Sequence, residues 1–289
     1  MLNHILKQKG LESNIILVSS RQNGKLLTNF PLLDQFDFMV NVVKFKNGEN
    51  YVVNASDISE DDYRFAPLYL FNDYGFNLDS KDSNFIEFNQ FRSENDVRFK
   101  YSVKNGELIE QRIDSFDGYF FNKNSDKKDL INTYITPPIY IVNDNDLKEP
   151  VYKDKKYTIS HTNRKPFNQP DFIPIENPLK QFIDHYEFKE ENRVDNIEFN
   201  FPFYHKVIVT IEVPAGYEVI QPQQFAELIK KSDLLIYNQT FGQKDNILQI
   251  GYEFYLGKAI FPSGDYSLLK SFFEQVQQAA NKQFTLKRK

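Results

Sequence analysis

The side chains that could carry chemistry in this chain are four histidines and a few carboxylates. The histidines share no metal-ligand spacing: His4, His161, His185 and His205. The 289 residues contain no cysteine, which excludes thiol nucleophiles, thiolate metal sites and disulfides within the chain. We therefore expect the histidines to be surface or packing residues, and we predict no metal site and no cofactor.

The carboxylates could act as bases or bind a cation. Asp37 is expected to face solvent on the polar side of its strand, and Asp57 is expected to end a strand as a turn former. The run Glu60, Asp61 and Asp62 lacks the alternating ligand pattern of a calcium loop. We expect all five carboxylates to be solvated residues without a catalytic role.

The charge of the chain argues against nucleic-acid binding. Its 35 Lys and Arg residues are outnumbered by 40 Asp and Glu residues, giving a formal net charge of -5. Phosphate binding requires a clustered basic surface instead. The basic run Lys287-Arg288-Lys289 is predicted to be a solvated terminus. No apolar run approaches the roughly 18 residues of a membrane-spanning helix, so no transmembrane segment is predicted.

The pattern of apolar residues predicts β-hairpins. The first spans 36–57 with Asn-Gly at 47–48, and the second spans 97–113 with Asn-Gly at 105–106. This dipeptide favours the positive φ angles of a two-residue hairpin turn. Further strands are predicted at 205–213 and 247–260.

A helix over 265–280 is predicted to close the chain. Its apolar residues recur at three- and four-residue spacing, which indicates a single buried face. The face comprises Leu268, Leu269, Phe272, Phe273, Val276 and Ala279 or Ala280. Ser263 or Asp265 could cap the first turn. A short amphipathic helix is also expected over residues 1–10.

Three segments resemble the end of the transglutaminase-like core of a group of large exported bacterial proteins. They are 20–24, 30–37 and 52–57. In such cores a Cys nucleophile is served by a His on one strand and an Asp on the next. The resemblance places Phe38 at or beside the His position and Asn54 at the Asp position. Both catalytic positions are therefore degenerate, and no catalytic residue is predicted.

The resemblance extends toward the C-terminal end of the sequence. Residues 213–217 and 260–273 resemble the domain of unknown function that follows the core in these proteins. Residues 177–179 resemble an Asn-Pro-Phe motif, with Leu179 in place of Phe. The resemblance implies a periplasmic or exported protein.

The sequence thus predicts an α+β fold in three parts. They are a partial transglutaminase/papain-like core over 1–79, a β-rich connecting region over 80–191, and a mainly antiparallel β-sandwich with a carboxy-terminal helix over 192–289.

Function is expected to follow from the degenerate core. Phe38 cannot accept a proton, so we expect no enzyme activity. We predict a catalytically inactive binding or assembly module that pairs with a protein partner or with a missing amino-terminal domain. Two alternatives stay open. The chain could be part of a split or longer cysteine peptidase or transglutaminase whose nucleophile lies upstream of Met1, or a carbohydrate-binding β-sandwich.

Overall fold

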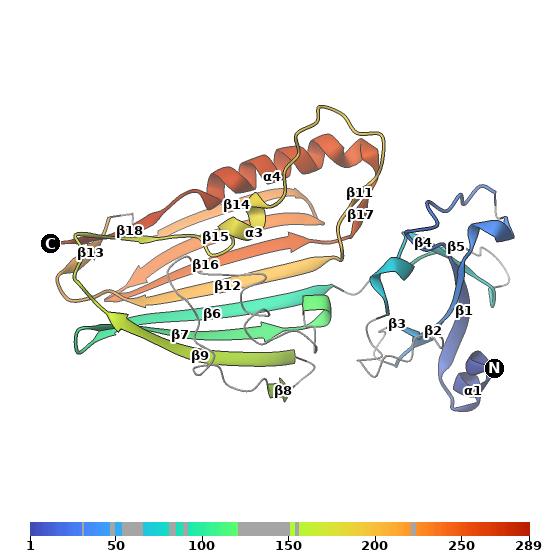
Figure 1. Ribbon diagram of the computed structural model, residues 1–289, viewed down its shortest axis with the longest axis horizontal. Helices are drawn as coiled ribbons and strands as arrows, with labels where there is room; N and C mark the ends of the chain where they lie inside the picture. The colour runs from blue at the N-terminus through green and yellow to red at the C-terminus, as the bar shows by residue number, and fades with distance from the viewer. Residues whose placement is uncertain are drawn as a thin grey trace. The chain divides into compact units, whose positions relative to one another are not determined.

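The fold is described from a computed structural model (Figure 1). It describes residues 1–30, 32–46, 50–53, 66–80, 85–88, 92–120, 151–153, 156–220 and 224–289. The chain divides into two compact units. The first comprises Met1–Phe91, Glu198–Phe201 and Lys258–Ile260, and the second comprises Arg92–Ile197, Pro202–Gly257 and Phe261–Lys289.

The first unit is built on a five-stranded antiparallel sheet of order β3-β2-β1-β4-β5. The strands are β1 Glu12–Val18, β2 Phe38–Lys44, β3 Asn50–Val53, β4 Tyr74–Asn77 and β5 Phe85–Glu87. Helix α1 (Leu2–Gln8) precedes β1 and buries no residue completely. The first predicted hairpin is confirmed by the pairing of β2 with β3, while its Asn-Gly turn lies outside the described residues.

The second unit contains an eight-stranded sheet of order β14-β15-β16-β12-β6-β7-β9-β8. Its strands are β6 Ser93–Lys104, β7 Glu107–Phe116, β8 Val151–Lys153, β9 Lys156–Pro166, β12 Phe203–Glu212, β14 Gln224–Ser232, β15 Leu235–Lys244 and β16 Ile247–Leu256. The β6–β7 hairpin confirms the second predicted turn, because Asn105 and Gly106 have φ angles of 53° and 77°. All neighbouring strands run antiparallel except β12 and β6.

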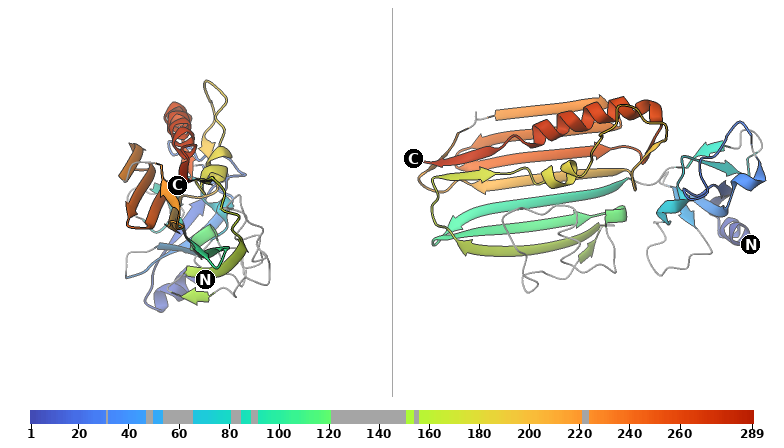
Figure 2. Two further views of the ribbon diagram at one scale, coloured as in Figure 1. Left: turned by 90° about the vertical axis from the view of Figure 1, so that its left-hand side faces the viewer. Right: turned by 45° about the horizontal axis from the view of Figure 1, so that its top comes forward.

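One face of this sheet is covered by helices and a smaller sheet (Figures 1 and 2). The covering elements are α3 Lys180–Asp184, α4 Tyr266–Ala280 and the three-stranded sheet of β10 Phe172–Ile175, β18 Phe284–Arg288 and β13 Tyr217–Val219. Alternate residues of β16 point into this core and are fully buried, including Tyr252 and Phe254. The Phe254 ring lies 5.6 Å from that of Phe272 and 5.7 Å from that of Phe273, so α4 packs directly on the strand.

The predicted helix needs three corrections. Leu268 is 36% exposed and lies at the edge of the buried face. Asp265 occupies the N-cap without a side-chain capping bond, because Ser263–Asp265 forms a 3-10 turn before the helix. The helix does not close the chain, since β18 follows it and pairs with β10 and β13. Two of the basic residues near the chain end therefore lie on a strand.

The chain is mostly β-sheet with few helices, which confirms the α+β prediction in this coarse form. The transglutaminase-like core stays a prediction. The predicted division at residue 191 differs from the sheet arrangement, because 92–116 and 156–166 share one sheet with 203–256. The described part of the chain contains no helix that is long and apolar enough to cross a membrane.

Candidate functional site

Two of the segments that carry the resemblance meet in the loop between β1 and β2 of the first unit. The Ser20 backbone N–H donates to Asp37 Oδ1 at 2.7 Å, and its hydroxyl donates to Oδ2 at 2.6 Å. The Asp37 N–H in turn donates to the Val18 carbonyl at 3.1 Å. Asp37 is exposed, as expected, and it also joins the two ends of the loop.

The interior of the loop is held by Gln35. Its Oε1 accepts from the Leu27 N–H at 2.7 Å, and its Nε2 donates to the Phe30 carbonyl. The Gln35 carbonyl accepts from Asn23 Nδ2 at 2.9 Å. Gly24 has a φ of 98°, a conformation that favours glycine. The loop backbone is therefore fixed by side-chain hydrogen bonds.

Arg21 anchors the loop to other segments of the first unit. Its N–H donates to the Tyr69 carbonyl at 2.9 Å, and Nε donates to the Phe71 carbonyl at 2.8 Å. Its Nη1 and Nη2 donate to the carbonyls of Phe199 and Asn200 at 3.0 and 3.3 Å. The three side-chain bonds are all to neutral backbone carbonyls, which is a structural role.

The same loop exposes four large apolar side chains among polar ones. They are Leu27 (58% exposed), Phe30 (69%), Leu32 (65%) and Leu33 (77%), which together we call the apolar loop. Single exposed apolar residues are normal on protein surfaces, but clustered ones mark interaction sites. The loop therefore combines a hydrogen-bonded backbone with four exposed apolar side chains.

Of the two degenerate positions that the resemblance identifies, the structure describes Phe38. Phe38 begins β2 opposite Val18, and its ring lies 5.3 Å from that of Tyr69. Asn54, Asp57 and the acidic run at 60–62 lie outside the described residues. The Ser20 hydroxyl is buried and bonded to a carboxylate, an arrangement that offers no exposed nucleophile.

The histidines are dispersed through the fold. His4 pairs with Gln8 on α1 at 2.9 Å. His161 Nε2 lies 3.6 Å from Glu110 Oε1, and both side chains are buried. His205 is fully buried, and this burial lowers its pKa to about 3, so it is neutral at ordinary pH. His185 lies beside the ring of the following tyrosine.

Sequence reasoning missed a buried ion pair on β7. Arg112 donates from Nε to Asp114 Oδ2 at 2.8 Å and from Nη2 to Oδ1 at 2.7 Å, and both side chains are 1% exposed. Burial raises the pKa of Asp114, while the adjacent guanidinium opposes the rise. The i, i+2 spacing on a predicted strand could have indicated that the two side chains share a face.

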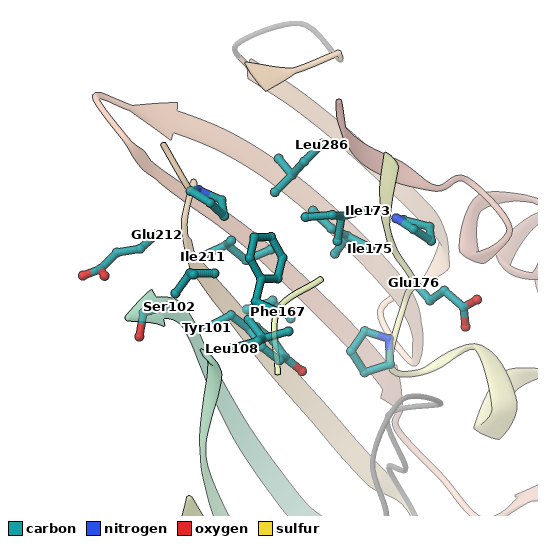
Figure 3. A pocket seen from close by; sticks show the side chains of 15 residues that line it. Tyr101, Ser102, Leu108, Phe167, Ile173, Ile175, Glu176, Ile211, Glu212 and Leu286 are labelled. Atoms are coloured by element: carbon teal, nitrogen blue, oxygen red, sulfur yellow. The ribbon is translucent and has the colours of Figure 1, made fainter. Parts of the chain in front are cut away.

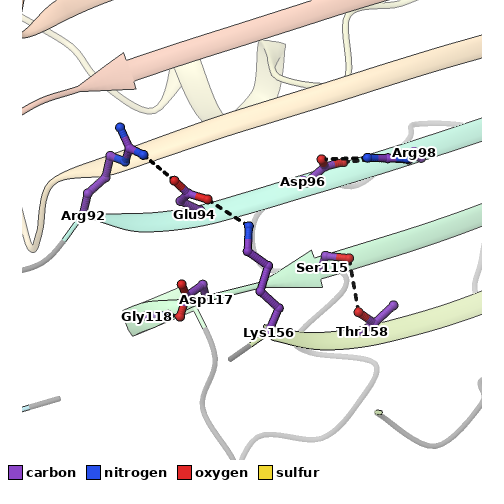
Figure 4. A network of polar contacts seen from close by, with 9 residues as sticks. All are labelled: Arg92, Glu94, Asp96, Arg98, Ser115, Asp117, Gly118, Lys156 and Thr158. Carbon is purple, nitrogen blue, oxygen red and sulfur yellow. Dashed lines mark hydrogen bonds and ion pairs between the residues drawn. The ribbon is translucent and has the colours of Figure 1, made fainter. Parts of the chain in front are cut away.

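A second ionic network lies on the opposite, open face of the eight-stranded sheet (Figure 4). Glu94 accepts from Lys156 Nζ at 2.9 Å and from Arg92. Burial raises the pKa of Glu94, but these two hydrogen bonds outweigh it, and the net shift is downward. The network links β6 to β9 across β7, which is a structural arrangement.

The chain therefore folds into two β-rich units, and the first carries the apolar loop. Residues 172–286, which include β10, α4 and β18, match the family model described as a domain of unknown function with a solved structure, DUF3858. The predicted domain of unknown function is thereby confirmed for this segment.

One solved structure is similar to the chain. It is described as a "putative protease" from Parabacteroides distasonis, with 14% sequence identity and a TM-score of 0.47. The similarity covers 99% of this chain and 42% of that chain, so the present sequence spans less than half the length of that protein. No curated protein matches. A transglutaminase-like origin stays a prediction.

Proposed function

We propose that this chain is a catalytically inactive binding or assembly module whose first unit binds a protein partner through the apolar loop. The observation that carries the proposal is the exposure of four large apolar side chains, from 58% to 77%, on a loop fixed by Gln35 and Asp37. A pre-organised loop loses little conformational entropy when it binds.

The magnitude of apolar burial supports this role. Full burial of one large apolar side chain is worth roughly 1.5–3 kcal/mol, so the four together could supply several kcal/mol. Association itself costs roughly 4–15 kcal/mol, and the partner must therefore contribute further contacts around the loop. Leu32 and Leu33 are the two most exposed leucines of the apolar loop, so their burial by a partner would contribute the most free energy among the leucines.

The absence of catalysis is supported by the residue types. A Cys-His-Asp site requires a thiolate and an imidazole base. The chain contains no cysteine, and Phe38, which the resemblance places at or beside the His position, packs on Tyr69. We therefore expect no peptidase or transglutaminase turnover from this chain.

Site-specific photo-crosslinking in the native host tests the partner. A benzoylphenylalanine at position 30 or 33 is expected to crosslink to one defined protein. The same residue at position 228 is the control, because Leu228 is 64% exposed but lies on β14 of the second unit. Identical crosslinks at all three positions, or none at 30 and 33, would contradict the proposal.

A charge substitution gives a second test. Leu32→Asp with Leu33→Asp is expected to abolish the crosslink from position 30 while leaving the thermal stability unchanged, since both side chains are exposed. An unchanged crosslink would rule out the loop as the binding surface. Purified chain is also expected to release no product from peptide or glutamine-amide substrates, and measurable turnover would refute the inactive assignment.

A further inference from the structure

The second unit contains an apolar cavity between the covered face of its large sheet and the β10–β18 pair (Figure 3). Its volume is about 90 Å³. Side chains from separate strands and loops surround it, including Tyr101, Leu108, Phe167, Ile173, Ile211 and Leu286. Because these residues come from distant parts of the sequence, the cavity exists only in the folded unit.

The position of the cavity follows from the strand register. Ile173 and Leu286 are directly paired across β10 and β18, and they form one wall. Leu108 and Val103 are paired near the turn of the β6–β7 hairpin, and Ile211 lies near the end of β12. The cavity thus lies where β6 and β12 end and β7 begins, and it is partly open.

The chemistry of the lining selects an apolar occupant. Apolar cavities of this kind stay dry and bind small hydrophobic groups. A cavity of about 150 Å³ accepts a benzene ring, so a volume of about 90 Å³ suits a branched aliphatic group better than an aromatic one. A leucine side chain meets this requirement.

Two carboxylates flank the cavity on opposite sides, Glu176 and Glu212 (Figure 3). Glu176 follows β10, and Glu212 is the last residue of β12. Among the described residues, neither carboxylate takes part in an ion pair or hydrogen bond. Their negative charge therefore favours a ligand that carries positive charge beside its apolar group.

We infer that the cavity is a socket for one aliphatic side chain of a partner polypeptide, flanked in that partner by Lys or Arg. The socket recognises a basic-aliphatic-basic segment: the aliphatic group enters the cavity, and the basic groups lie near Glu176 and Glu212. This inference is independent of the apolar loop, which lies in the other unit.

Methyl NMR on the full chain tests the inference with the acetylated tripeptide amide Lys-Leu-Lys. Saturable shifts are expected for the methyl groups of Ile211 and Leu286, with at least fivefold weaker binding of Lys-Ala-Lys and Glu-Leu-Glu. No shift at these methyl groups, or equal binding of Lys-Leu-Lys and Lys-Ala-Lys, would overturn the socket. Equal binding of Lys-Leu-Lys and Glu-Leu-Glu would overturn the role of the carboxylates.

Two variants separate the contributions. Glu176→Gln with Glu212→Gln is expected to weaken Lys-Leu-Lys binding by about threefold per carboxylate, as for exposed ion pairs, while Glu-Leu-Glu, which lacks the basic groups, is not weakened. Ile173→Phe is expected to fill the cavity and abolish the shifts at Ile211 and Leu286. If this variant fails to fold, the glutamine variant and the peptide series still decide the outcome.

Discussion

The buried Arg112–Asp114 pair allows a sharp test of how this sheet is stabilised. Replacing Asp114 by Asn keeps the shape of the side chain but removes the carboxylate charge that is hydrogen-bonded to the buried guanidinium. Both partners are 1% exposed, and their two hydrogen bonds are 2.7 and 2.8 Å long. Removing one partner of such a buried ion pair lowers the free energy of unfolding by about 3–5 kcal/mol. We expect Asp114→Asn to lose that much unfolding free energy.

The neighbouring strand offers a matched control. Asp96 and Arg98 form the same type of pair, two residues apart on β6, at 3.1 Å. These side chains are 24% and 61% exposed, so water screens the pair. Exposed pairs contribute about 0–1 kcal/mol. Asp96→Asn is therefore expected to cost less than about 1 kcal/mol.

Urea unfolding followed by circular dichroism measures both variants, with equal m-values as the condition for comparing them. A loss below about 1 kcal/mol for Asp114→Asn, or equal losses in the two variants, would refute the reasoning. A double replacement of Arg112 by Met and Asp114 by Leu is expected to recover most of the loss, because it removes both buried charges together.

Three further predictions use other parts of the second unit. His205 has a pKa of about 3 when folded against 6.5 when unfolded, so only the unfolded state gains a proton between these values. The contribution of His205 to the free energy of unfolding should be full above pH 6.5 and fall by about 1.4 kcal/mol per pH unit below it. Urea titrations across pH 4–7 should show a flatter pH dependence for His205→Phe. Gly118→Ala should lower the melting temperature more than Gly216→Ala, because both have positive φ but only the first would place a Cβ within 2.4 Å of another atom. Phe272→Ala should lower the free energy of unfolding, measured with urea, by about 3–5 kcal/mol. Leu268→Ala should lower it far less, because Leu268 is 36% exposed. Equal losses would contradict the assigned buried face of α4.

Local features of the fold could be predicted from sequence because short-range chemistry determines them. Asn105-Gly106 specifies its hairpin through backbone conformation, and the spacing of Phe272 and Val276 specifies the buried side of α4. The parallel pairing of β12 with β6 could not be predicted from sequence. The alternation of apolar and polar residues indicates which face of a strand is buried, but it does not indicate which strands lie beside it.

Only part of the candidate site could be predicted from the sequence. The segments around Ser20 and Asp37 were selected through a resemblance, but their direct hydrogen bonds depend on the folded loop. Leu32 and Leu33 were not predicted as binding residues, because apolar patterns are interpreted as buried by default. The cavity was missed because its walls come from segments that converge only in three dimensions.

The parallel pairing of β12 with β6 has a consequence for synthesis on the ribosome. Phe203 of β12 pairs with Ser93 of β6, so one edge of β6 stays unpaired until β12 has been synthesised, roughly 110 residues later. At about 5–20 residues per second, this delay lasts roughly 5–20 s. During that interval the nascent β6–β7 hairpin presents an unpaired strand edge that can recruit a neighbouring chain. Crowded polysomes translating this message therefore favour misassembly, and shielding of the nascent chain becomes a requirement for a good yield of folded protein.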